Sequence, residues 1–549
     1  MSDDGRARRD PGSNERTRRN LLRASALAGG SAVAVVLASK GRASAQGSLP
    51  DAILAVMNKP RYASATWNLF VTDVETGAIV YELRPDQLAF TGSVRKLFSV
   101  GLALRQLGAG HRFTTPVYRR GEIDRRGVLH GDLVLVGAGD LTFGGRATAD
   151  GGIAFTNFDH NDANSLGTAI LTPQNPLHGV DALAQQIHNA GIRSVAGDVI
   201  VDDRLFQRFR VPNGNLLITP VMVNENMVDV TVTPTQPGRA ASIDWRPKTS
   251  AFAVTGSVNT VAAGEPDTVT LSGDGLATCI GTPGCTGALS GDIPIGYEAP
   301  LSGRPTLVQT FRIEEPAAFA RTALIDALKR AGVNFAAPVV AANRPRSLPP
   351  ADAYPTDTRV AGFVSPPYAE YAKLILKVSL NLGANLSLML YGLTQRRRTI
   401  DGALAAEQTA LVNYLGIPAD SFHFPTNGSG SPDSQATPRA VVQLLTAMGR
   451  SEVAAPYRAA LPVLGVDGSL AGSGVNLPAR GHVYAKTGTT IIGGALVAQN
   501  LAGYIDARSG RRLAFALFVN DAGPITAISD VTEVFDDQAA ITNVIYERA

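Results

Sequence analysis

The sequence predicts an α/β protein whose main domain is interrupted by a long β-rich insertion. Strand-like and helical segments open the chain, and short β-type runs between Gly, Asp and Pro turns dominate from about residue 121 to residue 350. Helices return after that stretch, followed by a C-terminal sheet. Because 549 residues are too many for one compact core, we expect several domains.

The first part of the main domain is expected within residues 46–120. Two short strands, 66–74 and 78–81, flank a Glu-Thr-Gly turn. A buried helix follows at 92–107, because its apolar residues recur at helical spacing, and Gly108 ends it.

The insertion is expected to span 121–350. Helices at 180–191 and 316–331 interrupt its β-type runs. Gly, Ser, Thr and Pro are abundant over 236–305, which predicts a smaller all-β subdomain. The clearest strand-like runs are 131–136, 197–201 and 228–232.

The second part of the main domain is expected over 351–549. A Pro-rich crossing at 342–358 leads into it. Its elements complete the α/β pattern of the first part. The expected helices are 367–393, 437–449 and 529–547, and the expected strands are 482–487, 494–506 and 512–519.

Residues 1–45 have the pattern of an export signal. Residues 17–23 (Thr-Arg-Arg-Asn-Leu-Leu-Arg) resemble the twin-arginine pattern, an apolar segment follows at 24–39, and Ala-Ser-Ala at 43–45 offers a cleavage site. The alternative is a disordered basic tail that touches nucleic acid. These 45 residues carry a net charge of +5 and the whole chain +3, so the remainder is slightly acidic and no nucleic-acid partner is expected. We therefore expect an exported protein, periplasmic or otherwise extracytoplasmic.

The rest of the sequence indicates whether membrane-spanning segments and disulfides are present, both of which depend on the cellular compartment. No later run is long and apolar enough to span a bilayer, so no transmembrane segment is expected. Cys279 and Cys285 lie in a Gly/Pro-rich loop, and two close cysteines in an exported protein predict a disulfide. Free thiols or half of a metal site are the alternatives, although no histidine lies nearby in sequence.

Ser93 and Lys96 form the first of three short motifs. Residues three apart share a helix face, so the Ser93 hydroxyl and the Lys96 amine can meet at the helix start. A hydroxyl becomes a nucleophile when an adjacent base takes its proton, and a desolvated lysine is such a base. The alternative is a surface serine beside a solvated lysine. Of the eight lysines, however, only Lys96 has a serine three positions before it.

Ser379 and Asn381 form the second motif, at the end of a strongly apolar stretch. A serine hydroxyl can relay a proton, and an asparagine amide can hold both a lysine and a substrate carbonyl. The alternative is a pair of polar residues at a helix end, so this motif gains meaning only beside the others.

The third motif lies on the strand expected at 482–487 and just beyond it. The edge of a strand can pair with an extended peptide, and glycine permits a close approach. The lysine and threonine side chains can bind a carboxylate, and the amide of the last residue could form an oxyanion hole with the amide of Ser93. The alternative is a turn that happens to hold these residues. The motif is Lys486, Thr487, Gly488 and Thr489.

In this order the three motifs resemble those of penicillin-binding proteins and class A β-lactamases. Ser93 and Ser379 are 286 positions apart, whereas Ser379 and Lys486 are only 107 apart. A large insertion after the first motif is similar to the class C low-molecular-mass penicillin-binding proteins, the D-alanyl-D-alanine carboxypeptidase/endopeptidase family. Further segments from 131–140 to 513–515 also resemble that family, so the likeness covers nearly all of the chain after the export signal.

The resemblance implies the transpeptidase fold of penicillin-binding proteins and serine β-lactamases, an antiparallel sheet flanked by helices. It also implies a serine-type D-Ala-D-Ala carboxypeptidase or endopeptidase that acts on peptidoglycan peptides and is acylated by penicillins. Ser93 is then the nucleophile and Lys96 its base. Ser379 and Asn381 relay the proton to the leaving amine and position Lys96, and Lys486 and Thr487 bind the terminal carboxylate. No metal or organic cofactor is implied, and peripheral association with the membrane or the wall stays open.

Three places depart from the family pattern. Leu380 stands where Asp is common, Asn385 stands where an acidic residue is expected, and 427–432 (Asn-Gly-Ser-Gly-Ser-Pro) differs from the usual Asp-Gly-Ser-Gly-Leu-Ser. Two alternatives follow: a β-lactamase or esterase on the same fold, or a catalytically weak wall-binding protein. The large insertion argues against the first, and the intact motif residues argue against the second.

Overall fold

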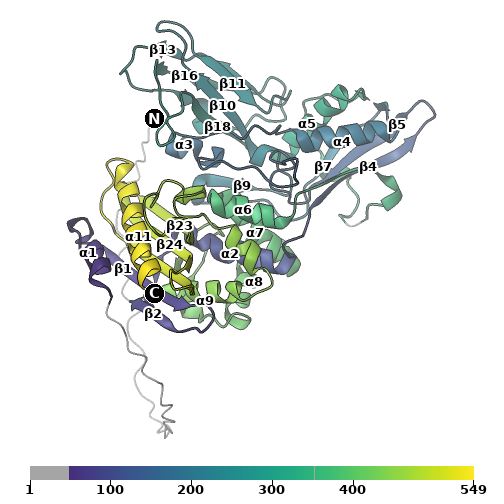
Figure 1. Ribbon diagram of the computed structural model, residues 1–549. Coiled ribbons are helices and arrows are strands. Elements are labelled where there is room, and N and C mark those ends of the chain that lie inside the picture. The colour runs from purple at the N-terminus through teal and green to yellow at the C-terminus, as the bar shows by residue number, and fades with distance from the viewer. Residues whose placement is uncertain (1–48, 352) are drawn as a thin grey trace, which may run out of the picture. The chain divides into compact units, whose positions relative to one another are not determined.

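The computed structural model describes residues 49–351 and 353–549. Its main sheet has five antiparallel strands in the order β2-β1-β25-β24-β23. The sheet joins strands from the beginning of the chain to strands from its end (Figure 1). The strands are β1 (Thr66–Asp73), β2 (Ile79–Leu83), β23 (Val483–Ile492), β24 (Ala495–Asp506) and β25 (Arg512–Asn520).

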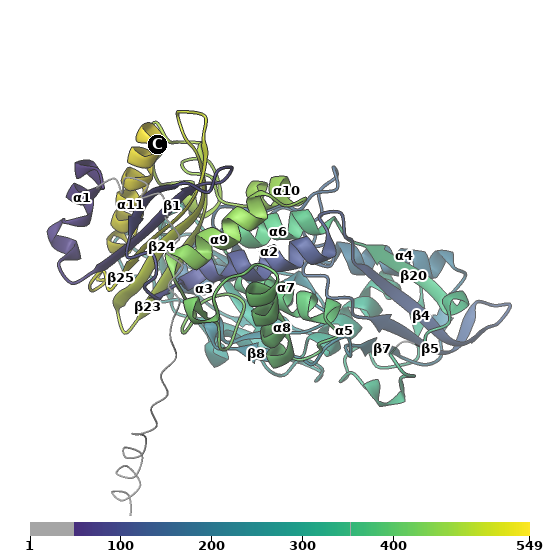
Figure 2. The same cartoon turned by 90° about the horizontal axis from the view of Figure 1, so that it is seen from below.

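Helices cover both faces of this sheet, because its central strands alternate between two cores. In β25, Phe515 and Leu517 belong to one core, whereas Ala516 and Phe518 belong to the other. Figure 2 shows α1 and α11 on one side of the sheet and α2 and α9 on the other. The helices are α1 (Asp51–Met57), α2 (Lys96–Leu107), α6 (Tyr368–Lys377), α7 (Asn381–Thr394), α8 (Ile400–Asn413), α9 (Pro438–Gly449), α10 (Ala454–Ala459) and α11 (Ser529–Arg548).

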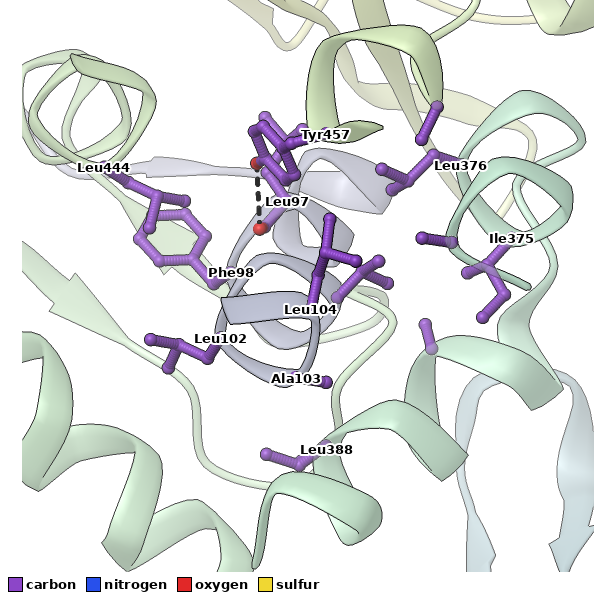
Figure 3. Close-up of a cluster of buried hydrophobic side chains, with 14 of the residues drawn as sticks. Leu97, Phe98, Leu102, Ala103, Leu104, Ile375, Leu376, Leu388, Leu444 and Tyr457 are labelled. Carbon is purple, nitrogen blue, oxygen red and sulfur yellow. Dashed lines mark hydrogen bonds between the residues drawn. The ribbon is translucent and has the colours of Figure 1, made fainter. Parts of the chain in front are cut away.

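Most residues of helix α2 are buried. Leu97 and Leu104 are fully buried and lie in one apolar cluster with Ile375 of α6 and Leu444 of α9 (Figure 3). The hydroxyl of Tyr457 donates a hydrogen bond of 3.0 Å to the Leu97 carbonyl. This packing fixes the start of α2 and the 3₁₀ turn before it, Gly92–Arg95, where the first motif lies.

The strands between the two parts of the main sheet form separate sheets. One has the order β19-β6-β5-β4-β20 with β7 paired to β5, and another has the order β11-β10-β18-β15. Their elements include α3 (Ala163–Leu166), α4 (His178–Asn189), α5 (Pro316–Arg330), β4 (Thr114–Ile123), β5 (Val128–Val136), β6 (Ser194–Val195), β7 (Val199–Asp202), β10 (Met227–Thr233), β11 (Ser242–Arg246), β15 (Leu276–Ala277), β18 (Leu307–Ile313), β19 (Asn334–Phe335) and β20 (Arg359–Val364).

Within 236–305 the chain forms strands and no α-helix. Cys279 and Cys285 are joined by a disulfide there, with their Cα atoms 5.3 Å apart. The domain limits expected from the sequence, including 121–350, stay a prediction. The short strands not yet named are β3 (Ala89–Phe90), β8 (Phe209–Val211), β9 (Leu216–Ile218), β12 (Ala253–Gly256), β13 (Asn259–Val261), β14 (Thr270–Leu271), β16 (Thr286–Ser290), β17 (Asp292–Pro294), β21 (Phe422–His423) and β22 (Gln435–Ala436).

The prediction of one helix over 367–393 is wrong, because the chain breaks between α6 and α7. Ser379 lies at the break with φ 60°, in the left-handed region that non-glycine residues rarely adopt. The third-motif strand also runs further than the expected 482–487, since β23 ends at Ile492. Helix α8 was not predicted at all.

Candidate active site

Ser93 and Lys96 meet at the start of α2. The Lys96 amine donates to the Ser93 hydroxyl oxygen at 2.5 Å. It also donates to the Ser379 hydroxyl oxygen at 3.3 Å and to the Ser429 carbonyl at 3.1 Å. These three acceptors are all neutral, and they bring the first two motifs together around one amine.

The surroundings of Lys96 favour its uncharged form. Its side chain is fully buried, and this desolvation holds the pKa of Lys96 well below its usual value. The positive charge of Lys486 lowers the pKa further, while the carboxylate of Asp162 opposes the shift. In that uncharged form the amine has two N–H groups and one lone pair. It can then donate to Ser379 and Ser429, accept the hydrogen bond of the Ser93 hydroxyl through the lone pair, and take that proton.

The second motif occupies the break between α6 and α7. Lys377 anchors the end of α6, because its amine donates to both carboxylate oxygens of Asp467 at 2.7 Å. Asn381 opens α7, and its side-chain oxygen is buried with no hydrogen-bond partner among the described residues. That oxygen is therefore an acceptor which a substrate amide could satisfy.

The third motif lies on β23, one of the two edge strands of the main sheet. Lys486 is fully buried, and its amine donates to the Thr487 carbonyl at 2.9 Å. Desolvation lowers the pKa of Lys486 to about 7, although Asp162 opposes the shift. The Thr487 hydroxyl shares a hydrogen bond of 2.9 Å with the Ser469 hydroxyl, which fixes it beside the lysine.

Two glycines let β23 touch the start of α2. A Cβ on Gly488 would lie 2.3 Å from the Thr91 carbonyl oxygen and 3.1 Å from the Ser93 amide nitrogen. A Cβ on Gly92, whose φ is 48°, would lie 2.8 Å from the Thr489 amide nitrogen. Neither position can hold a side chain without moving the backbone. The amides of Ser93 and Thr489 therefore lie on two segments in direct contact, an arrangement that can bind an oxyanion.

The two asparagines that depart from the family pattern build the loop beside Lys96. The Asn385 amide donates to the Asn381 carbonyl at 2.9 Å and to the Ser429 hydroxyl at 3.0 Å. Its oxygen accepts from the Gly428 amide at 2.8 Å. Asn427 accepts from the Ser429 amide at 2.8 Å. Because an ionised carboxylate at position 385 could not donate, asparagine suits this loop, which presents the Ser429 carbonyl to Lys96.

The insertion adds a carboxylate that the sequence analysis missed. Asp162 lines a cavity of about 260 Å³ together with Leu380, Asn381 and Arg312. Desolvation raises the pKa of Asp162 to about 6, and the positive charge of Lys96 opposes that rise. No local pattern marks this residue, since it is far from all three motifs in the chain.

A buried charge cluster holds the turn that carries Asp162. Arg146 donates to both oxygens of Asp159 at 2.7 and 2.8 Å and to Glu225 at 2.9 Å. The ring of His160 lies 2.6 Å from an oxygen of Asp229 and 2.5 Å from one of Glu225. Desolvation would lower the pKa of His160, but Asp229 and Glu225 raise it to about 10. All five side chains are buried.

Among residues 49–351 and 353–549, no group of three or more His, Cys, Asp or Glu side chains could hold a metal ion. Within the same part of the chain, no helix is long and apolar enough to cross a membrane. The twin-arginine pattern and the cleavage site predicted at 43–45 lie outside the described residues.

The fold and the site together define a class. An antiparallel sheet flanked by helices, with a buried Ser–Lys pair beside a Lys-Thr-Gly edge strand, is the arrangement of penicillin-binding serine peptidases. Comparison with known proteins narrows the class further. The chain belongs to the D-Ala-D-Ala carboxypeptidase 3 (S13) family, whose sequence profile matches residues 49–538.

Similar individual proteins support the same family assignment. The chain is 28% identical over 512 residues to a D-alanyl-D-alanine carboxypeptidase of Actinomadura sp. (strain R39), covering 88% of this chain and 84% of that protein. Penicillin binding protein 4 of Haemophilus influenzae has a similar fold, with a TM-score of 0.66, 18% identity, and coverage of 90% of this chain and 99% of that one. The same protein in complex with a β-lactam gives a TM-score of 0.63, 17% identity, and the same coverage of both chains.

These comparisons confirm the predicted family, the predicted fold class and the predicted D-Ala-D-Ala carboxypeptidase activity. Membership also implies peptidoglycan peptides as substrates, which places the family's work outside the cytoplasm. The family match favours the peptidase over the two alternatives, a β-lactamase or esterase and a weak wall-binding protein.

Proposed function

We propose that Ser93 is the nucleophile of the carboxypeptidase reaction and that Lys96 is its general base. The observation that carries the proposal is the 2.5 Å hydrogen bond between the two side chains, at a lysine whose pKa burial lowers. The neutral amine takes the hydroxyl proton as Ser93 Oγ attacks the carbonyl of the D-Ala-D-Ala bond. The amides of Ser93 and Thr489 then bind the negative oxygen of the tetrahedral intermediate.

Ser379 returns the proton to the leaving group. The Lys96 ammonium is 3.3 Å from Ser379 Oγ, so the hydroxyl can pass a proton to the amine nitrogen as the peptide bond breaks. The terminal D-Ala leaves and an ester on Ser93 remains. Asn381 orients the acyl-side amide through its unpartnered oxygen. Water then attacks the ester, which releases the acid and restores the serine.

Lys486 and Thr487 bind the terminal carboxylate of the substrate. Lys486 has a pKa of about 7, and an incoming carboxylate favours its charged form. The edge of β23 pairs with the extended peptide, so Gly488 and Thr489 contribute through their backbone.

The substrates are peptidoglycan stem peptides and, in an endopeptidase reaction, D-Ala-diaminopimelate cross-links. A β-lactam acylates Ser93 in the same way, which the β-lactam complex of the Haemophilus relative supports. Residues 1–45 export the protein by the twin-arginine route, and the mature enzyme works in the periplasm or at the wall.

The proposal is tested by release of D-Ala from a peptide that ends in D-Ala-D-Ala, with cross-linked muropeptides as a second substrate. The wild type and Ser509→Ala, a control at an exposed turn serine, should release D-Ala, and Ser93→Ala should not. Cleavage of the muropeptides would add endopeptidase activity, and their persistence would exclude it. D-Ala release by Ser93→Ala at the wild-type rate, or none by the wild type, would overturn the assignment.

A further inference from the structure

Arg95 stands in the chain between the nucleophile and its base, yet its guanidinium binds Glu407 on α8. We propose that Arg95, clamped by Glu407, is a positioning residue that holds Ser93 Oγ on Lys96 Nζ. The inference rests on the proposed role of Ser93. None of the three motifs includes Arg95 as a functional position.

The clamp has a fixed geometry. The Arg95 guanidinium donates two hydrogen bonds to Glu407, one of 2.8 Å to Oε1 and a shorter one to Oε2. The two side chains are 0% and 1% exposed. The guanidinium carbon also lies 4.0 Å from the centre of the Phe424 ring. Two parallel hydrogen bonds and a stacked ring define both the plane and the direction of the arginine.

The clamp holds the turn that carries Ser93 through a different side chain of that turn, Arg95. Ser93 and Lys96 face the same side, because they are three residues apart at a helix start. Arg95 lies on another side of that turn and reaches Glu407 on α8. Any rotation of the turn about its axis would have to break the two hydrogen bonds to Glu407. The clamp therefore resists the rotation that would separate Ser93 Oγ from Lys96 Nζ.

The same clamp reaches the other side of Lys96. Phe424, on which Arg95 stacks, lies three residues before Asn427, the first residue of the loop at 427–430. That loop supplies the Ser429 carbonyl that accepts from Lys96 at 3.1 Å. Arg95 thus belongs to one segment that sets the position of the catalytic amine, the start of α2, and contacts the chain leading into the other, the loop at 427–430.

Stability alone does not account for a charged pair at this place. Removing two charges from water is costly, and well-packed apolar residues of the same volume often serve stability equally well or better. What an apolar pair cannot supply is a fixed orientation, because it has no directional bonds. We therefore expect this pair to affect the chemical step more than the fold.

The test is the double variant Arg95→Met/Glu407→Leu, which keeps the volume and removes both charges. Stopped-flow acylation by a fluorescent penicillin separates the acylation rate constant from the non-covalent dissociation constant. We expect the rate constant to fall about 10- to 100-fold, the range in which small misplacements of reacting groups act. The dissociation constant and the melting temperature should stay near the wild-type values. Wild-type acylation by the double variant would overturn the inference.

Two single variants keep the test decisive if the double variant does not fold. Glu407→Gln retains the shape and removes the carboxylate, so its acylation rate constant should also fall, and an unchanged constant would overturn the inference. Arg321→Met is the matched control, since Arg321 is a fully buried arginine bound to Asp198 in the insertion. It should lower the melting temperature and leave the rate constant of the folded enzyme unchanged. A wild type that forms no adduct would instead refute Ser93 as the nucleophile.

Discussion

The active site and the insertion both bury positive charge, but they surround it differently. Lys96 and Lys486 donate to hydroxyl and carbonyl oxygens, and burial lowers the pKa of both. Arg146 and His160 lie against three carboxylates, which raise the pKa of both against the effect of desolvation. A buried cation without a hydrogen-bonded carboxylate can lose its proton and act as a base, whereas a paired one keeps its charge and holds structure.

The largest effect is expected from Lys96→Met, which removes the base and keeps an unbranched side chain. Acylation by penicillin should fall about 10²- to 10⁴-fold, the usual contribution of a general base, measured by stopped-flow fluorescence. The melting temperature should not fall, because no buried partner charge is left behind. The control is Lys248→Met, at an exposed lysine. Acylation within about 10-fold of wild type would break the assignment of Lys96.

Arg146→Met tests the buried cluster of the insertion, in which the cation is paired with carboxylates. The substitution removes the bidentate partner of buried Asp159 and leaves Glu225 with His160 alone, so the free energy of unfolding should fall by about 3–5 kcal/mol. Denaturant unfolding followed by circular dichroism measures this loss. Molecules that remain folded should still form the penicillin adduct. An unchanged unfolding transition would show that the cluster does not hold the insertion together.

The same cluster predicts a loss of stability in acid. Desolvation alone would raise the pKa of Glu225, but Arg146 and His160 lower it from 4.5 to about 2. A carboxylate with a lowered folded pKa stabilises the protein above its unfolded pKa, and that stability is lost as the pH falls from 4.5 toward 2. The stability gap between the wild type and Glu225→Gln should therefore shrink by about 1–3 kcal/mol over that window. A gap that stays constant would contradict the pairing.

A smaller effect is expected from Asp162→Asn. Asp162 belongs to the insertion, but its charge acts on the two lysines of the active site. The Asp162 charge raises the pKa of Lys96 and of Lys486, so its removal should lower both. The acid limb of the acylation pH profile should then move to lower pH, and the rate on the alkaline plateau should change less than about 10-fold. Asp274→Asn, at an exposed position, is the control. A limb that moves to higher pH would contradict the electrostatic role.

Side chains in short local motifs could be predicted from the sequence, because helix and strand spacing alone bring them together. Ser93 and Lys96 are examples, and so is the position of Lys486 on an edge strand. The Ser429 carbonyl could not be predicted, since a backbone oxygen has no side-chain signature. Asp162 could not be predicted either, because long-range packing within the insertion brings it to the site.

Most helices and strands could be predicted from the sequence, but the point at which one helix ends and the next begins could not. The single helix expected over 367–393 divides at Ser379, whose left-handed backbone depends on tertiary contacts rather than on propensity. Helix α8 did have a signal, since Thr399 accepts a hydrogen bond from the Gly402 amide as an N-cap. Glu407 lies on that helix, so the contact between Arg95 and Glu407 could not be predicted while the helix was missed.

The central claim is that the buried Ser93–Lys96 pair forms an acyl-enzyme. Incubation with penicillin, digestion and tandem mass spectrometry test it most directly. The predicted result is a mass increase of one whole penicillin on the peptide that contains Ser93, and no adduct in Ser93→Ala. An adduct on another residue, an adduct that persists in Ser93→Ala, or no adduct on the wild type would contradict the claim.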